Sequence, residues 1–359
     1  MAAKQSLAVA LEPRASAAFD DYVVDCAWSP DGRSLAVTGG EGKVALGRLA
    51  PATLTQSAHG SLTLDVIGEH LLGTIALAWQ PRGAIFATAG QDGAVALWDA
   101  DSGKSVKRWK PAPTATQALC FSPDGATLAS AAGKSVTLWS SAGDKIHAFA
   151  PAATSAAALA FDRPGTDLGV ALNGEIAVHR IEPSSHGAGR YETRRYKWPA
   201  ACLTVNFSGN GRFLVSGMAD GSLHFWNRST GKDSQMRGYD GKVELVGWSD
   251  NSRYLASCAG NDIVLWDFTG RGPEGTKPIV LSGHTDRVDA FAWQTGGDHF
   301  ASGGRDWRLT LWRPGKATQP LDVQMLDSEV SATRWSPDGK RLAVGEKKGR
   351  VTIFDLVSR

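Results

Sequence analysis

The sequence predicts an all-β fold in which eight similar four-stranded units pack side by side in a closed ring. The first observation is internal repetition: AWSPDGRSLAV at 27–37 returns as CFSPDGATLAS at 120–130 and as RWSPDGKRLAV at 334–344, and five weaker copies fill the gaps. The second is the period, since aromatic anchors recur about every 44 residues, the length of a four-stranded blade of a β-propeller. The anchors are Trp28, Trp79, Phe121, Phe161, Phe207, Trp248, Trp293 and Trp335.

Each copy contains the signals of three consecutive strands. An apolar strand ends at the aromatic anchor, and the Ser-Pro-Asp-Gly that follows in three copies suits a type I turn, because proline presets φ at the second position and glycine is favoured at the fourth. A second strand follows, then a turn with glycine or aspartate. The third strand alternates in polarity, as in GAVALW at 93–98 and WRLTLW at 307–312. Strands of this length leave little room for helix.

The two ends of the chain predict how the ring closes. The last copy stops at 356–359, directly after its third strand, whereas an extended segment around 11–19 precedes the first copy. Because blades must pack side by side to bury their faces, we expect this segment to supply the outer strand of the final blade. Pro13 is acceptable there, since an outermost strand leaves one row of amides unpaired. The prediction is a flexible N-terminus over 1–9 and one propeller domain over 10–359.

Three short motifs recur within the copies. Gly-His precedes a first strand at 283–284, aspartate occupies the turn before the third strand, and Trp-Asp ends that strand at 98–99 and 266–267. With these marks in register, the chain resembles the WD40 repeat family over nearly its whole length. The resemblance implies a β-propeller, most often of seven blades. The count favours eight, with seven as the alternative, because the copy around Phe161 has His179 where tryptophan is expected.

A histidine, a hydroxyl residue, an aspartate and a tryptophan recur at fixed spacing. They are His284, Ser302, Asp306 and Trp312 in the seventh copy and His70, Thr88, Asp92 and Trp98 in the second, separated by 18, 4 and 6 residues in both. Ser, His and Asp could form a nucleophilic triad. A catalytic centre is made once, however, and the family resemblance implies a structural hydrogen-bond chain. We therefore expect no catalytic residues and no enzymatic activity.

The fifth and sixth copies have Trp198 and Tyr239 at the histidine position. Neither copy therefore offers the complete set of four residues. We expect apolar packing to hold those two blades.

Composition excludes several classes of function. The net charge of +2 gives no electrostatic reason to bind nucleic acid or a membrane in bulk. The N-terminus lacks the apolar run of a signal peptide, and no segment approaches the length of a membrane span. The four cysteines stand singly and the eight histidines are scattered, so we expect no metal, no cofactor and a cytoplasmic protein with reduced thiols.

Two stretches support alternative functions. The segment RYETRRYKW at 190–198 interleaves cations with aromatic residues, as single-stranded RNA or DNA binding requires, although an edge strand protected by charge has the same composition. The segment DADSGKSVKRW at 99–109 resembles the tryptophan-docking motif of quinoprotein dehydrogenases. That motif occurs once, so a quinoprotein-like enzyme is a distant alternative, and Trp109 is expected to pack on an outer strand.

Propellers of this family usually bind proteins or peptides on the face with the loops that enter the first strand. Trp307 lies in a turn on that face where glycine is commoner, and aromatic and arginine residues are enriched in binding hot spots. The alternative is that Trp307 only covers the adjacent loop. We predict a non-enzymatic scaffold, monomeric by itself within a larger complex, with a protein or peptide site centred on copies six to eight. The candidate residues are Trp307, Arg287, Arg305, Asp289, Lys242, Glu244, Glu329 and Tyr22.

Overall fold

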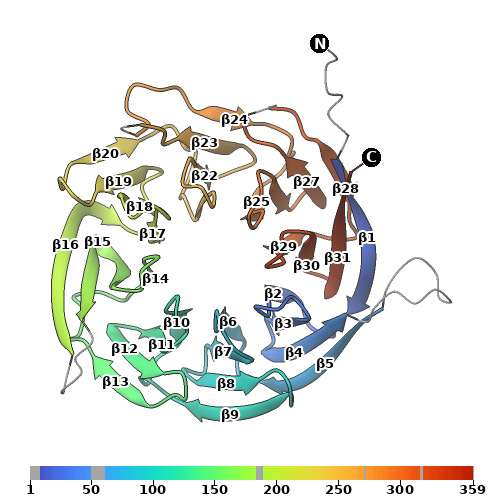
Figure 1. Ribbon diagram of the computed structural model, residues 1–359, viewed down its shortest axis with the longest axis horizontal. Helices are drawn as coiled ribbons and strands as arrows, with labels where there is room; N and C mark the ends of the chain where they lie inside the picture. Colours follow the sequence, from blue (N-terminus) through green and yellow to red (C-terminus); the bar gives the residue numbers. More distant parts are fainter. Residues whose placement is uncertain (1–8, 50–60, 183–188, 271, 316–317, 359) are drawn as a thin grey trace.

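Each of the eight repeats folds into a small antiparallel sheet, and the sheets stand side by side in a ring in the computed structural model (Figure 1). The structure describes residues 9–49, 61–182, 189–270, 272–315 and 318–358. None of these residues forms a helix, so this part of the chain holds no helix that could cross a membrane. The prediction of an all-β ring of eight blades is confirmed, and the seven-bladed alternative is wrong. The predicted N-terminal boundary falls largely on residues 1–8, which lie outside the described ranges.

Within each blade, the strands follow one another in chain order from the centre of the ring to its rim, except that β1 is the outermost strand of blade 8. The innermost strands of blades 1 to 8 are β2 (Val23–Trp28), β6 (Thr74–Trp79), β10 (Thr116–Phe121), β14 (Ala158–Phe161), β17 (Asn206–Phe207), β21 (Leu245–Trp248), β25 (Val288–Trp293) and β29 (Val330–Trp335). The second strands are β3 (Ser34–Gly39), β7 (Ile85–Gly90), β11 (Thr127–Ala132), the first part of β15 (Asp167–Glu182), β18 (Phe213–Gly217), β22 (Tyr254–Cys258), β26 (Phe300–Gly304) and β30 (Arg341–Glu346).

The third and outermost strands complete the blades. The third strands are β4 (Lys43–Leu49), β8 (Val95–Asp99), β12 (Ser135–Ser140), the second part of β15, β19 (Leu223–Asn227), β23 (Ile263–Asp267), β27 (Arg308–Trp312) and β31 (Arg350–Ser358). The outermost strands are β5 (Leu62–Glu69), β9 (Lys104–Trp109), β13 (Lys145–Ala148), β16 (Arg190–Ala201), β20 (Asp233–Met236), β24 (Ile279–Leu281), β28 (Asp322–Met325) and, for blade 8, β1 (Val9–Ala18).

Strand β1 closes the ring, as the sequence predicts. It pairs antiparallel with β31, with Leu11 opposite Leu356, and the register shifts between Pro13 and Ala15. A bulge at this point accommodates the missing amide of proline. Leu11 is 1% exposed in the core between blades 7 and 8, and its amide donates to Asp322 Oδ2 at 2.9 Å. The first strand of the chain is therefore fixed to both of the last two blades.

The core of the molecule lies between the blades. Buried apolar side chains form eight separate clusters, and each joins two neighbouring blades, including blades 8 and 1. Three aromatic anchors add hydrogen bonds across these interfaces: the indoles of Trp28, Trp293 and Trp335 donate to carbonyls of the preceding blade at 3.0, 3.0 and 3.2 Å. Because each blade buries its faces only against its neighbours, stability depends on closure of the ring.

The divergent copy around Phe161 forms blade 4. Ile181 N donates to Thr166 O at 2.7 Å, so the two ends of β15 lie side by side and the strand turns back at Asn173 and Gly174. Asn-Gly favours a two-residue hairpin turn, and Gly174 has φ +87°. One continuous element thus supplies both middle strands of this blade.

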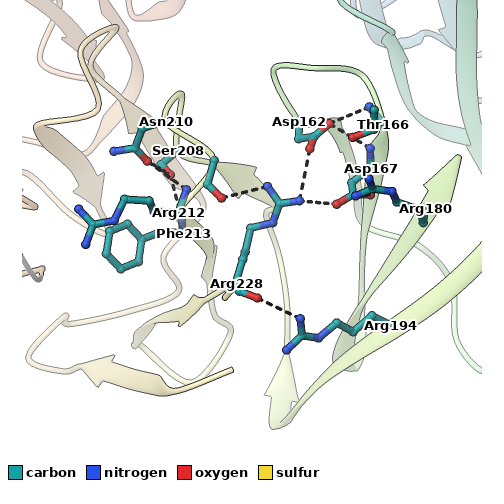
Figure 2. A network of polar contacts seen from close by, with 11 residues as sticks. Asp162, Thr166, Asp167, Arg180, Arg194, Ser208, Asn210, Arg212, Phe213 and Arg228 are labelled. Atoms are coloured by element: carbon teal, nitrogen blue, oxygen red, sulfur yellow. Dashed lines mark hydrogen bonds and ion pairs between the residues drawn. The ribbon is translucent and has the colours of Figure 1, made fainter. Parts of the chain in front are cut away.

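A partly buried arginine joins blade 4 to blade 5 (Figure 2). Arg228, which follows β19, forms ion pairs with Asp167 and, at 3.3 Å, with Asp162, both in blade 4. Its other terminal nitrogen donates to Gly211 O at 3.1 Å, and Arg194 Nη1 of β16 donates to the Arg228 carbonyl at 3.0 Å. These contacts link the divergent blade to its neighbour by charge as well as by apolar packing.

Candidate interaction face

The four polar residues of blade 7 form one directed chain of hydrogen bonds. Asp306 Oδ1 lies 3.1 Å from His284 Nδ1, Ser302 Oγ lies 2.8 Å from His284 Nε2, and Trp312 Nε1 donates to Ser302 Oγ at 2.8 Å. A carboxylate can only accept, so the imidazole carries its proton on Nδ1 and Nε2 accepts from the hydroxyl. Ser302 is 0% exposed. No substrate carbonyl can reach it without opening the blade interface, so the geometry serves packing.

Blade 2 repeats this arrangement with threonine in place of serine. His70 Nε2 lies 2.8 Å from Thr88 Oγ1, which accepts from Trp98 Nε1 at 2.8 Å, and His70 Nδ1 lies 3.2 Å from Asp92. Burial lowers the pKa of His70, although its bond to Asp92 opposes the shift. Burial disfavours the charged form of Asp92, but bonds from Ala94 N and His70 outweigh it and lower the pKa of that carboxyl. The histidine is therefore neutral and the aspartate ionised at neutral pH.

The expectation that apolar packing alone holds the sixth blade is wrong. Tyr239, at the histidine position, places its hydroxyl 2.6 Å from Ser257 Oγ and accepts from Trp266 Nε1 at 2.9 Å. The Tyr239 hydroxyl thus takes the position of the histidine imidazole next to the serine, and it also accepts the indole N–H that the serine or threonine hydroxyl accepts in blades 7 and 2. Trp198, in β16 of blade 4, has its ring centroid 3.9 Å from that of His224 in blade 5, and its indole nitrogen has no hydrogen-bond partner among the described residues.

One face of the ring carries the segments that enter the innermost strands and the turns between the second and third strands; we call it the loop face. In five blades a turn amide donates to the carbonyl of the entering segment, as Arg305 does to Arg287 at 2.9 Å and Lys347 to Glu329 at 2.9 Å. Five innermost strands also share a bulge, which in β25 leaves Asp289 unpaired between Val288 and Ala290. A bulge redirects a side chain, so these positions differ in direction from the rest of the strand.

Four of the predicted contact residues meet around Asp289 on this face. The carboxylate of Asp289 binds Arg305 Nε at 3.0 Å and Arg287 Nε at 3.1 Å, and Lys347 Nζ of the next blade lies 3.4 Å away. Arg287 Nη2 reaches Glu244 of blade 6 at 2.5 Å. Three cations therefore share one half-buried carboxylate, and the terminal nitrogens of Arg305 have no partner among the described residues.

Trp307 lies in the same turn as Arg305. Its side chain is 44% exposed, and its φ of +63° falls in the left-handed region, which is costly for a bulky residue. Lys348 Nζ of blade 8 lies 5.4 Å from the ring centroid, within range of a cation–π contact. We call Trp307, Arg287, Arg305, Asp289 and Lys348 the Trp307 cluster.

The three remaining predicted residues lie where the chain enters blades 1, 6 and 8. Tyr22 is 48% exposed where the chain enters blade 1, Lys242 is exposed before β21, and Glu329 is partly buried before β29. Within the described ranges, no ion pair or side-chain hydrogen bond joins these three residues to the Trp307 cluster. Lys347 and Lys348 were not singled out from the sequence, because only the segments that enter the first strands and the turn of blade 7 were considered.

The basic-aromatic segment at 190–198 forms most of β16, an outermost strand. Its aromatic residues are already packed: Tyr191 stacks on His147 at 3.7 Å between ring centroids, and Tyr196, 6% exposed, contacts Trp226 at 5.8 Å. Arg195 pairs with Glu175 of the same blade. A strand that binds single-stranded nucleic acid needs open ring faces for the bases, so this packing weighs against the nucleic-acid alternative.

Trp109 and the four cysteines, the other candidate groups, are packed within the fold. Trp109 lies on outer strand β9 with its ring 5.0 Å from Trp139 of the next blade. The four cysteines are unpaired, and burial raises the pKa of Cys26 and of Cys120 to about 12. Within the described ranges, no group of three or more His, Cys, Asp or Glu side chains could hold a metal ion.

These features define a class of protein: a closed eight-bladed β-propeller with hydrogen-bond chains buried inside its blades. The family model described as WD domain, G-beta repeat matches residues 15–46, 63–99, 104–140, 194–227, 233–267 and 275–313, which is more than half of the chain. Residues 315–359 match the WD40 domain of anaphase-promoting complex subunit 4. The chain belongs to the WD40 repeat family, whose members typically serve as scaffolds for protein interactions.

Individual relatives are distant. THO complex subunit 3 of Arabidopsis thaliana is 32% identical over 126 residues, 34% of this chain and 39% of that protein. WD repeat-containing protein 1 of Gallus gallus is 22% identical over 337 residues, 81% of this chain and 55% of that protein. The chain therefore spans less than two thirds of either relative. The crystal structure of the computationally designed Ika8 protein shares the fold, with a TM-score of 0.74 at 19% identity over 96% of this chain and 99% of that one.

Proposed function

We propose that this protein is a non-enzymatic cytoplasmic scaffold that binds an acidic protein or peptide segment through the Trp307 cluster. The observation that carries the proposal is Trp307 itself, a large aromatic side chain that is 44% exposed in a left-handed turn. Exposure gives up apolar burial and the left-handed backbone costs free energy, so the fold gains little from tryptophan there. Exposed tryptophan and arginine are the residues most enriched in binding hot spots.

The charges around Trp307 support an acidic partner. Arg305 and Arg287 are both about half exposed, with side-chain exposures of 47% and 44%, and each keeps donor groups beyond its bond to Asp289. Lys348 adds a cation over the indole. A guanidinium can bind a carboxylate through two parallel hydrogen bonds, so aspartate or glutamate next to an apolar residue fits this cluster. Among the relatives, THO complex subunit 3 is named as a subunit of a complex, which is consistent with a protein partner.

Quantitative affinity capture from a native lysate tests the proposal. We compare wild type with Trp307→Ala/Arg287→Ala and with a control, Val106→Thr/Ile146→Thr, which changes two side chains that are 51% and 50% exposed on the outer strands of blades 2 and 3. We expect the site variant to lose at least one captured protein by tenfold or more while the control retains it. Identical capture by all three proteins would contradict the proposal.

A further inference from the structure

Two adjacent leucines protrude from the loop face between blades 1 and 2. Leu71 and Leu72 are 67% and 77% exposed, the highest values for large hydrophobic side chains in the described part of the chain. Leu72 also has a φ of +68°, a left-handed conformation that leucine rarely adopts. Exposed apolar residues gathered on one surface mark interaction sites. Neither the exposure of the two leucines nor the left-handed conformation of Leu72 stabilises the fold. A binding role would explain both features.

The surrounding structure holds these leucines in place. Leu71 N donates to Asp92 Oδ2 at 3.3 Å, so the hydrogen-bond chain of blade 2 also anchors the loop. The following Gly73 packs so closely that a Cβ there would lie 2.4 Å from Gly40 O. A Cβ on Gly40 itself would lie 1.5 Å from Tyr22 Cζ, so the tyrosine ring packs directly on this glycine. Tyr22 is 48% exposed. Leu71 and Leu72 thus lie on one side of the contact between Gly73 and Gly40 and Tyr22 on the other, and we call these three residues the Leu71 cluster.

Blade 7 shows that this loop does not require leucine. His284 occupies the position of His70, and Thr285 and Asp286 occupy those of Leu71 and Leu72. Thr285 N donates to Asp306 Oδ2 at 2.9 Å, the same contact that Leu71 N makes in blade 2. Polar residues therefore make the same hydrogen bond to the aspartate, and the two leucines are not required for it.

The charges beside the Leu71 cluster are negative. Glu41, in the turn that contains Gly40, and Glu69, directly before His70, are exposed and have no ion pair within the described ranges. The nearby cations are already engaged, since Lys43 binds Asp20 at 2.7 Å and Arg108 binds Asp92 at 2.6 Å. Exposed carboxylates without an ion pair, beside exposed leucines, favour a partner that carries lysine or arginine next to apolar residues.

We infer that the Leu71 cluster is a second docking surface, which binds a basic segment with at least two apolar side chains. The apolar side chains pack against Leu71, Leu72 and Tyr22, and the cations pair with Glu41 and Glu69. This surface lies on blades 1 and 2 and selects the charge opposite to that expected at the Trp307 cluster. It does not depend on the proposed function of that cluster.

Peptide selection tests the inference without a known partner. A phage-displayed library of random 12-residue peptides is selected on the whole chain and, in parallel, on Leu71→Thr/Leu72→Asn. Threonine is the residue of blade 7, and asparagine tolerates the left-handed conformation, so the variant should fold. An unchanged circular dichroism spectrum and thermal midpoint verify this. Peptides enriched only on wild type are synthesised, and their affinity is measured by fluorescence anisotropy.

We expect the enriched peptides to carry a net positive charge and two or more apolar residues, and to bind Leu71→Thr/Leu72→Asn at least tenfold more weakly. Glu41→Gln/Glu69→Gln should weaken binding and reduce its dependence on salt. Trp307→Ala/Arg287→Ala and Val106→Thr/Ile146→Thr should bind as wild type does, which separates this surface from the Trp307 cluster. Acidic or uncharged consensus peptides, equal binding to the leucine variant, or no enrichment would overturn the inference.

Discussion

Valine at position 88 would remove one hydroxyl from the buried chain of blade 2 while nearly preserving the shape of the side chain. Thr88 is 0% exposed, and its hydroxyl lies 2.8 Å from both His70 Nε2 and Trp98 Nε1. Thr88→Val leaves an indole N–H and an imidazole nitrogen without a partner. Each buried unsatisfied group costs about 1–3 kcal/mol, so we expect the free energy of unfolding to fall by about 2–6 kcal/mol.

Thr310→Val is the matched control. Thr310 is also 0% exposed, but its hydroxyl has no hydrogen-bond partner among the described residues. Valine there removes an unsatisfied buried polar group, so we expect stability to stay equal or to rise by about 1 kcal/mol. Urea unfolding followed by circular dichroism measures both variants. Equal loss of stability at the two positions would refute the argument that the hydroxyl of Thr88 contributes through its hydrogen bonds.

Three further substitutions test other parts of the structure. Leu11→Ala should lower the free energy of unfolding by about 2–5 kcal/mol because Leu11 is buried between blades 7 and 8; a change no larger than that of exposed Val323→Ala would argue against closure by β1. Tyr239→Phe should cost about 1–3 kcal/mol through loss of its bonds to Ser257 and Trp266, and an unchanged urea midpoint would contradict that role. Burial, then Arg195 and His147, lowers the pKa of His179 to about 4. The unfolded imidazole titrates near pH 6.5, so the folded state resists protonation and the free energy of unfolding falls as the pH drops from about 6.5 to 4, by up to about 3 kcal/mol. His179→Phe should remove this contribution to the pH dependence of urea unfolding. Parallel stability profiles of wild type and variant would contradict the role of His179.

The ring could be predicted because its signals are local and repeated. A turn such as Ser29 to Gly32 is specified by its own residues: Ser29 Oγ donates to Asp31 Oδ1 at 2.6 Å, and Gly32 adopts φ +68°. Eight copies of the strand and turn pattern at one period leave few alternatives to a propeller. Blade 4 was harder, because it lacks the tryptophan and the Gly-His, and the Asn-Gly at 173–174 carries its hairpin.

The surface of the loop face could be predicted only in part. Trp307 was recognisable because tryptophan replaces a glycine of the repeat. Leu71 and Leu72 were not recognisable, since their position beside a strand does not show whether a leucine side chain is buried or exposed. That outcome depends on the backbone conformation at Leu72 and on close packing of Gly73 against Gly40. Tyr239 was misjudged because only histidine was expected to complete a hydrogen-bond chain.

Site-specific photo-crosslinking tests the central claim most directly. The photoreactive residue p-benzoylphenylalanine replaces Trp307 in one protein and Ile146, 50% exposed on an outer strand, in another. After irradiation in native lysate, we expect a discrete adduct of higher mass from position 307 that an excess of wild-type chain removes, and no such adduct from position 146. Adducts from position 146 with none from position 307 would show that partners bind the rim of the ring, contrary to the proposed function.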